Sequence, residues 1–284
     1  MKTITTMIMA FLFVLVGNVA MAQKILMVPT STLKGPQGAV ANTIIDLSKS
    51  AGFEITATQK NSCAEAVDYF ENASGPVAII WSNTMVKNGE LIKQNCTIDF
   101  KKAAAIAVTY SAYDVCVLKG TKLEPNKTYK LGNNKFNPTM RIRDELNKNK
   151  MGIKFTDVTY ESSAATVTGI INKEIDVAYT ATGNASAAMK SGSIECLYTT
   201  GESKHGQQPL GAFVEKSDLN DYQLGMMVFT RNLTAEQADK LKKSLSKDFA
   251  TQMSTQDMIG SKVAPSKTDV DKFYATAMKY ATYN

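Results

Sequence analysis

The sequence predicts an α/β protein of two lobes, in which two mixed, mostly parallel β-sheets are joined by hinge strands. Runs of alternating strand and helix patterns lie at residues 24–81 and again at residues 128–200. One long extended segment, residues 103–120, separates the two runs. Strand–helix–strand alternation is typical of parallel sheets with right-handed crossovers. Two such sheets connected by extended crossings predict a hinge and a cleft between the lobes.

The first run begins with the apolar stretch KILMVPTS, residues 24–31, which we expect to form a buried strand. Apolar residues at helical spacing then predict a helix that closes at Gly52, a residue type favoured just after a last helical turn. FEITATQK, residues 53–60, alternates as a strand, and Ser62 begins the next helix with a capping-box sequence. PVAIIW, residues 76–81, completes a β-α-β-α-β order.

The second run repeats this order. Its expected strands are TYKLGN, FTDVTY, IDVAYT and IECLYT. Between them, residues 137–152 have Asn before the first turn, Pro in it and Gly at the end, which strongly predicts a helix. SSAATVTGIINKEI predicts a second helix, and NASAAMKSG a short third one that starts at Asn184.

The C-terminal part returns to the first lobe. GMMVFT, residues 225–230, is a strand pattern, and helical patterns follow it. The leucines and phenylalanine of the first of these helices recur every four residues, which is typical of a packing face. We therefore expect the first lobe to comprise residues 23–115 and 225–284, and the second lobe residues 116–224.

The N-terminus, residues 1–22, has the pattern of a secretory signal peptide. Lys2 precedes an apolar core from about residue 7 to residue 16, and Ala20-Met21-Ala22 fits the small-x-small cleavage rule. The apolar run is well short of the ~20 residues that span a bilayer. We predict cleavage after Ala22, export, and location in the periplasm.

Composition and motifs argue against several classes of function. The net charge is +6, but the lysines are scattered among acids and no basic run is interleaved with aromatic residues, so we expect no nucleic-acid partner. The single histidine, His205, lies in a loop sequence and is expected to be exposed. No Gly-x-Ser-x-Gly motif, Walker-type loop or metal-ligand spacing occurs. We predict no enzymatic activity, no cofactor and no metal site.

The cysteines are Cys63, Cys96, Cys116 and Cys196. Four cysteines allow three complete pairings, and the sequence does not choose among them. Cys116 and Cys196 lie in strand patterns, where a free cysteine can act as a small apolar side chain. Cys63 and Cys96 lie near turns and are the pair that we favour as a disulfide.

A family resemblance adds to these expectations. INKEIDVAYT, followed by MKSGSIECLYTTG, is similar to two conserved segments of extracytoplasmic solute receptors with the type II periplasmic-binding fold. The chain most resembles the substrate-binding proteins of tripartite tricarboxylate transporters. Two loops depart from that family: TSTLKGPQG replaces a Gly-Gly loop that holds a ligand carboxylate, and NKFNPT replaces a Gly-x-Gly-Ser turn. The resemblance therefore implies the fold more strongly than the ligand.

Four turns are the candidate ligand site, because ligands of open α/β sheets bind beyond the carboxyl ends of the strands, where helix N-termini point N–H groups at them. These turns are rich in small hydroxyl and amide residues, which can also be plain helix caps. Trp81 and Tyr179, beside them, can stack on a ligand or pack in the core. The candidate residues are Thr30, Ser31, Thr32, Trp81, Ser82, Asn83, Asn137, Pro138, Thr139, Tyr179, Thr180, Ala181 and Thr182.

Three cations lie close to these turns. Lys34 follows the first strand, and Arg141 and Arg143 lie in the early turns of the helix that begins near residue 137. An arginine there can hold a carboxylate with two parallel hydrogen bonds. Exposure to solvent, or pairing with Asp144 or Glu145, is the alternative that we favour.

These observations predict a receptor that captures a small organic solute, most simply a carboxylate, between its lobes. The expected partners are this small-molecule ligand and an inner-membrane transporter permease, with the receptor itself a monomer. A receptor for an ABC-type importer of an oxyanion, phosphonate or amino acid is the alternative, as is an exported ligand-sensing protein of the same fold.

Overall fold

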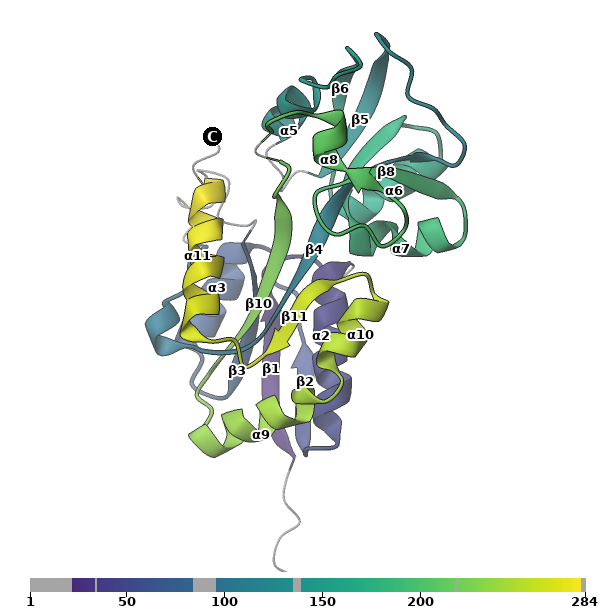
Figure 1. The fold of residues 1–284 in the computed structure, drawn as a ribbon. Helices are drawn as coiled ribbons and strands as arrows, with labels where there is room; N and C mark the ends of the chain where they lie inside the picture. The colour runs from purple at the N-terminus through teal and green to yellow at the C-terminus, as the bar shows by residue number, and fades with distance from the viewer. Residues whose placement is uncertain (1–21, 34, 84–95, 135–138, 218, 282–284) are drawn as a thin grey trace, which may run out of the picture.

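The computed structural model describes residues 22–33, 35–83, 96–134, 139–217 and 219–281. Most of the predicted signal peptide, as well as Lys34, Asn137 and Pro138, lies outside the described residues. The described part of the chain forms two lobes stacked end to end, with the strands β4 and β10 running between them (Figure 1). Within that part, no helix is both long and apolar enough to cross a membrane.

The first lobe is built on a mixed sheet in the order β2-β1-β3-β10-β4, with β11 also paired to β4. β1 is parallel to β2 and β3, whereas β10 is antiparallel to β3 and β4. All six residues of β3 are buried, as expected for a central strand covered on both faces. The strands are β1 (Gln23–Pro29), β2 (Phe53–Ala57), β3 (Val77–Ser82), β4 (Ala104–Leu118), β10 (Gln223–Arg231) and β11 (Ile259–Val263).

Helices cover both faces of this sheet and close two separate cores. One core contains Trp81, Phe70 and Phe273, and it lies under the helices α3 and α11. The other contains Ile44, Leu241 and Phe249, under α2, α9 and α10. The helices are α2 (Pro36–Lys49), α3 (Cys63–Asn72), α9 (Ala235–Ser246), α10 (Phe249–Thr255) and α11 (Lys267–Ala281). Thr234 forms a full capping box with Gln237. The box expected at Ser62 forms only in part: Ser62 accepts from the Glu65 N–H, but the Glu65 carboxylate accepts from the Asn61 N–H instead of the Ser62 N–H.

The second lobe is built on the other half of β4. From Tyr113 onward, β4 is antiparallel to β7 on one side and β8 on the other, while β5 is parallel to β6 and β7. The strands are β5 (Thr128–Asn134), β6 (Lys154–Tyr160), β7 (Val177–Ala181), β8 (Ile194–Thr199) and β9 (Gln208–Pro209). The helices are α5 (Thr139–Leu146), α6 (Ser163–Ile171), α7 (Thr182–Lys190) and α8 (Leu210–Phe213). A single strand thus belongs to both sheets, which makes β4 the direct link between the lobes.

Two helix boundaries differ from the prediction. α5 ends at Leu146 instead of continuing to Gly152, because the Asn149 side chain replaces further helical bonds: it accepts hydrogen bonds from the N–H groups of Met151 and Ile153. α7 begins at Thr182 instead of Asn184, so Asn184 is not its cap. Its side chain is therefore available for other contacts.

Both cysteine pairs are joined. Cys63 is bonded to Cys96, the pair that we favoured from the sequence. Cys116 is bonded to Cys196, so these two are not the free apolar side chains that their strand positions also allowed. The physical reason is register: Cys116 and Cys196 are direct partners in the antiparallel pairing of β4 with β8, although 80 residues separate them.

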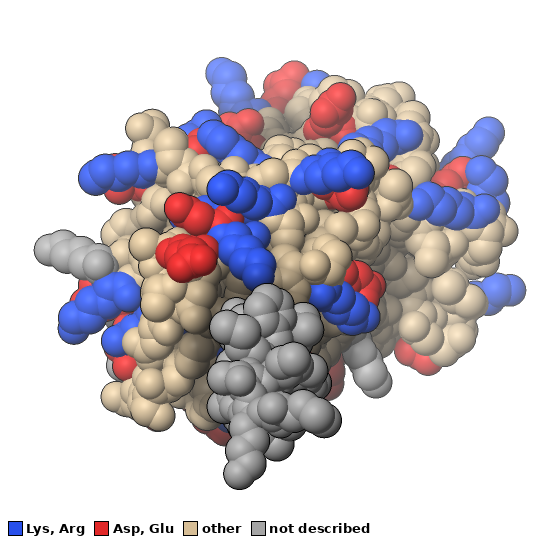
Figure 2. Space-filling model, turned by 90° about the horizontal axis from the view of Figure 1, so that it is seen from below, with Lys and Arg blue, Asp and Glu red and all other residues tan. Residues whose placement is uncertain are grey.

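Figure 2 shows the end of the first lobe that lies away from the second lobe. This face is not divided into a basic half and an acidic half. Lysine and arginine side chains lie there among aspartate and glutamate side chains. Several of these are local ion pairs, such as Lys49 with Asp46 at 2.7 Å. Pairs of this exposed kind contribute little to stability.

Candidate ligand site at the lobe junction

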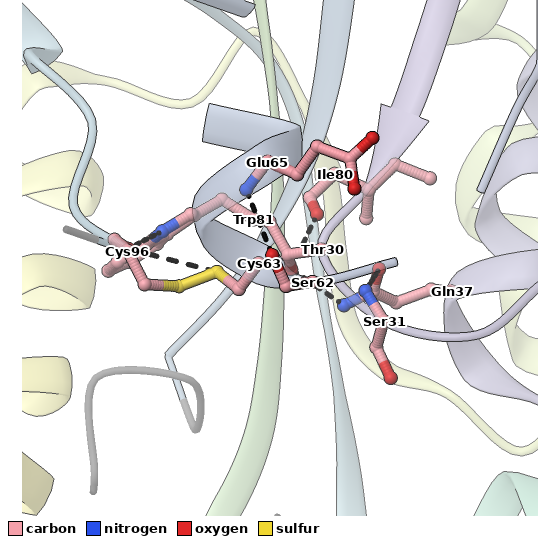
Figure 3. Close-up of a disulfide and its surroundings, with 9 residues drawn as sticks. All are labelled: Thr30, Ser31, Gln37, Ser62, Cys63, Glu65, Ile80, Trp81 and Cys96. Carbon is pink, nitrogen blue, oxygen red and sulfur yellow. Dashed lines mark hydrogen bonds between the residues drawn. A yellow bond between two sulfur atoms is a disulfide. The ribbon is translucent and has the colours of Figure 1, made fainter. Parts of the chain in front are cut away.

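The turn after β1 is organised by Gln37, in the first turn of α2 (Figure 3). The Gln37 amide donates to Thr30 Oγ1 at 3.1 Å and accepts from the Ser31 N–H at 3.1 Å. Thr30 also donates to the Ile80 carbonyl at 3.0 Å and is buried. Thr30 therefore fixes the turn, whereas Ser31 and Thr32 stay partly exposed beside it.

The turn after β3 is tied to β10. The Asn83 side chain accepts from the Gly225 N–H at 2.8 Å and donates to the Gln223 carbonyl at 3.2 Å. Asn83 and Ser82 are both fully buried. The structure thus gives Asn83 a role in joining strands, which its position in the sequence does not indicate.

Trp81 packs inside the first lobe. It is fully buried, lies at an edge-to-face angle to Phe100, and donates its indole N–H to the Cys96 carbonyl at 2.9 Å (Figure 3). Of the two roles open to it in the sequence, this arrangement is that of core packing. We therefore leave Trp81 out of the site proposed below.

The turn after β7 supplies the N-terminus of α7. Thr180 donates to the Ser163 carbonyl at 3.1 Å, and Thr182 donates to the Ala112 carbonyl of β4 at 3.1 Å. Both threonines and Ala181 are buried. The Gly183 N–H donates to Ser111 Oγ at 3.3 Å, and Gly183 itself is partly exposed. The hydroxyls thus anchor α7 to its neighbours and leave Gly183 and Asn184 at the surface of the junction.

Tyr179 faces the core of the second lobe. It is fully buried, and its ring stacks on Tyr113 with 5.0 Å between centroids and 9° between planes. This arrangement again corresponds to core packing, so Tyr179 too is left out of the proposed site.

The N-termini of α2 and α7 meet across the junction. Gly35, just before α2, is so close to Asn184 that a Cβ built on it would lie 2.6 Å from Asn184 Oδ1. A Cβ on Gly183 would lie 3.8 Å from Pro36 Cγ and 3.1 Å from Met258 Cε. The N-terminus of α2 in the first lobe therefore lies against that of α7 in the second. Helix N-termini offer unpaired N–H groups and a partial positive charge, which suits an anion.

Three of the four predicted turns are thus connected. The turns after β1 and β7 meet at Gly35 and Asn184. Asn83 ties the turn after β3 to β10, which pairs with β4, the strand that Thr182 contacts. For the fourth turn, Asn137 and Pro138 lie outside the described residues, and Thr139 opens α5. The side chain of Arg141 is likewise not described. Arg143 is paired with Asp144 and, at 3.1 Å, with Asp157, which is the alternative that we favoured.

A buried acid, Asp114 of β4, lies behind the turn after β7 and was missed in the sequence. It is fully buried, and its Oδ2 accepts from Gln207 Nε2 at 3.4 Å. Burial raises the pKa of Asp114 to about 6, against the opposing effects of Thr199, Thr182, Gln207 and the nearby His205. The signal available was one acid inside the otherwise uncharged extended segment YSAYDVCVL. Because Cys116 and Cys196 beside it form a disulfide, these three residues are not a metal site.

A separate hollow of about 520 Å³ opens beside β8, on the second lobe. It is lined by polar and apolar groups that include Lys119, Glu195 and Tyr198. Among the described residues, none of those predicted for ligand binding lines this hollow. We do not regard it as the predicted site.

The comparisons with known proteins agree with this architecture. No family model matches the sequence, and no curated protein does. Among solved structures, R. palustris Rpa4515 with adipate is similar over 93% of this chain and 97% of its own, with a TM-score of 0.70 and 16% identity. MatC from Rhodopseudomonas palustris, with bound malate, covers 91% of this chain and 98% of its own, with a TM-score of 0.66 and 12% identity.

A TctC solute-binding protein from Polaromonas, with no ligand, is similar over 92% of this chain and 97% of its own, with a TM-score of 0.61 and 12% identity. Likeness at this level of identity establishes the fold. The predicted fold class is therefore confirmed: the chain has the two-lobed type II periplasmic-binding fold of the TctC-type solute-binding proteins.

Proposed function

We propose that the protein is a periplasmic receptor that binds a small carboxylate between its lobes and delivers it to a membrane permease. The observation that carries this proposal is the meeting of the α2 and α7 N-termini at the junction. The partial positive charge of two helix N-termini that meet favours an anion there without any arginine. Neighbours of the same fold that hold malate or adipate support a dicarboxylate as the ligand class.

The proposed contact residues are those that remain partly exposed at the junction. They are Ser31, Thr32, Gly183 and Asn184. Thr30, Ser82, Asn83, Thr180, Ala181 and Thr182 act behind them as residues that hold the turns. The proposal also keeps Asn137, Pro138 and Thr139 as the fourth turn of the site.

Closure about β4 and β10 is the proposed mechanism. A ligand held first by one lobe gains contacts from the other and shifts the protein toward the closed form. The change of sheet within β4, between Ala112 and Tyr113, supports the lobe boundaries proposed at residues 115 and 225. We propose that the receptor is a monomer without enzymatic activity, exported by a signal peptide that is removed after Ala22.

The test is direct binding. Mature protein, purified through unfolding and refolding to remove any retained ligand, is titrated calorimetrically with adipate, malate and a panel of other mono- and dicarboxylates. We expect at least one of them to bind and to raise the melting temperature, because a ligand of the folded state stabilises it. The amide and alcohol analogues of the best carboxylate are the matched controls. Binding of amino acids, phosphonates or oxyanions instead would favour an ABC-type receptor, and failure of all panels would refute the proposal.

A further inference from the structure

One turn of the first lobe contacts both helices of the proposed site. This turn, Gln256–Met258, joins α10 to β11 and is called here the α10–β11 turn. Gln256 Nε2 donates to Thr43 Oγ1 of α2 at 3.3 Å. Met258 lies against Gly183 at the start of α7. The turn is therefore a shared support for the two N-termini that meet at the junction.

Asp257, the charged residue of this turn, lies against side chains of the second lobe. Its Oδ2 lies 3.1 Å from His205 Nε2 and 3.5 Å from Lys190 Nζ of α7. His205, expected from the sequence to be a plain exposed loop residue, is therefore paired across the two lobes. Only 7% of the Asp257 side chain is exposed, compared with 54% for Lys190 and 25% for His205. The Asp257 carboxylate is thus buried, whereas the side chains of Lys190 and His205 are partly exposed to solvent.

Two further hydrogen bonds join the second lobe to the same region of the first lobe. Lys204 Nζ donates to the Met258 carbonyl at 2.8 Å, and Lys190 Nζ donates to the Thr255 carbonyl at 3.4 Å. Ser186 of α7 also acts on Asp257: burial alone would raise the pKa of Asp257, but Ser186, His205 and Lys190 together lower it below its usual value. Asp257 is accordingly ionised at neutral pH, where it attracts the Lys190 ammonium of the second lobe.

We propose that Asp257 is a positioning residue that holds α7 against the first lobe and so stabilises the closed arrangement before ligand arrives. The first turn of α7 belongs to the proposed site, and its last two turns carry Ser186 and Lys190. Fixing these last turns fixes where Gly183 and Asn184 stand relative to α2. The inference rests on the proposed function for its link to ligand binding, but its structural claim is tested without any ligand.

The contacts of Asp257 hold the two lobes together without being part of the core of either lobe. Every partner of Asp257 named above comes from the second lobe, so opening about β4 and β10 would break these contacts while each lobe keeps its own core. Asp257 has a φ of 59°, a conformation that asparagine tolerates as well as aspartate. Asp257→Asn therefore removes the charge without new backbone strain.

The experiment measures the distance between the lobes in ligand-free protein. Spin labels are placed on Lys122→Cys, in the second lobe, and Lys243→Cys, in the first, both exposed positions. Distance distributions by pulsed electron resonance are compared for the otherwise wild-type protein, Asp257→Asn and Lys190→Met. Asp239→Asn, which removes an exposed charge of α9 in the same lobe, is the matched control.

We expect the ratio of short-distance to long-distance population to fall about fivefold in Asp257→Asn and to fall also in Lys190→Met, as for a modest coupling between parts. Asp239→Asn should match the unsubstituted pair. Unchanged distances in Asp257→Asn, or an equal change in the control, would overturn the proposal. With adipate as the probe, Asp257→Asn should weaken binding mainly through faster dissociation. If no carboxylate binds even the wild type, the proposed function fails. The interlobe distances in ligand-free protein still test whether Asp257 holds the lobes together.

Discussion

At the scale of single residues, Asp114 is the group whose chemistry the fold changes most. A fully buried carboxyl resists ionisation because charge is poorly solvated there, and the hydrogen bonds of Asp114 with Thr199, Thr182 and Gln207 offset this only in part. Its pKa of about 6 lies above that of an exposed aspartate. The unfolded chain therefore loses this proton at lower pH than the folded protein does.

The sign of the resulting pH dependence follows from this difference. As pH rises from about 4 to about 6, the unfolded chain binds fewer protons at this group than the native protein, so the free energy of unfolding falls, by about 3 kcal/mol in total. Asp114→Asn lacks this decrease. We expect urea unfolding to show the variant gaining stability relative to wild type between pH 4.5 and pH 7.5. For the exposed control Asp239→Asn, the free energy of unfolding should follow the same pH dependence as that of the wild type. The expectation would be contradicted if Asp114→Asn also followed the wild-type pH dependence.

Asn184 is the second residue with a specific prediction. Since α7 starts before it and its side chain reaches Gly35, Asn184 is placed for contact with a ligand rather than for capping. Asn184→Ala should reduce affinity for the best-bound carboxylate about tenfold, as for the loss of a hydrogen bond to a charged group. Melting temperature should change little.

The matched control for this variant is Asn172→Ala, because Asn172 is exposed at the end of α6. Calorimetric titration of both proteins measures the difference. Equal affinities in the two variants would remove Asn184 from the site.

At the scale of elements, the disulfide Cys63–Cys96 couples α3 to the segment that holds Trp81. The Cys96 carbonyl is the acceptor of the Trp81 indole N–H, and Trp81 is the only tryptophan in the chain. The fluorescence of the protein therefore reports on this one region. The other disulfide, Cys116–Cys196, belongs to the second lobe and lies in a different core.

Replacing Cys63 and Cys96 together by alanine should shift the emission of the folded protein to longer wavelength, because the indole loses a fixed partner and gains contact with water. Replacing Cys116 and Cys196 should leave the emission of the folded protein unchanged. Each pair of substitutions should lower the free energy of unfolding by about 4 kcal/mol, from the loop entropy that each bond removes. Emission spectra and urea unfolding test both statements, and a shift of the same size in both variants would contradict the first.

At the scale of the whole molecule, Gly35 of the first lobe and Asn184 of the second lie in close contact, and we expect this contact to limit how closely the lobes approach. Gly35 has a φ of 115°, which disfavours other residues, and the space for a side chain is taken by Asn184. Gly35→Ala should therefore both strain the turn and hold the lobes apart. We expect a larger radius of gyration by solution scattering and about tenfold weaker carboxylate binding, as for a loss of the closed population.

Gly52→Ala separates these two effects. Gly52 has a φ of 74° with nothing within 4 Å of an added Cβ, so this variant carries backbone strain without contact between lobes. It should lose stability while its dimensions and affinity stay those of wild type. Identical dimensions for Gly35→Ala and Gly52→Ala would show that the contact does not limit closure.

The sequence by itself determined most of the strands and helices and the class of fold, but not the short elements β9, α8 and β11. Apolar runs such as residues 76–81 and capping sequences such as that at Ser62 act over a few residues, so their outcome can be read locally. The two β-α-β runs and the extended segment between them were enough to predict two lobes. The same patterns placed Ser31 and Thr182 just after the ends of strands, because a residue that follows an apolar run can be located from the sequence alone.

Only the tertiary structure decided which residues meet. Cys116 faces Cys196, Asn83 holds Gly225, and His205 reaches Asp257 because strands and turns far apart in the chain are brought into register. The same packing put Trp81 and Tyr179 inside the cores and left Asp114 buried. Local patterns fix which face of a strand is apolar, but pairing and register depend on the free energy of the whole assembly, to which no short segment gives access.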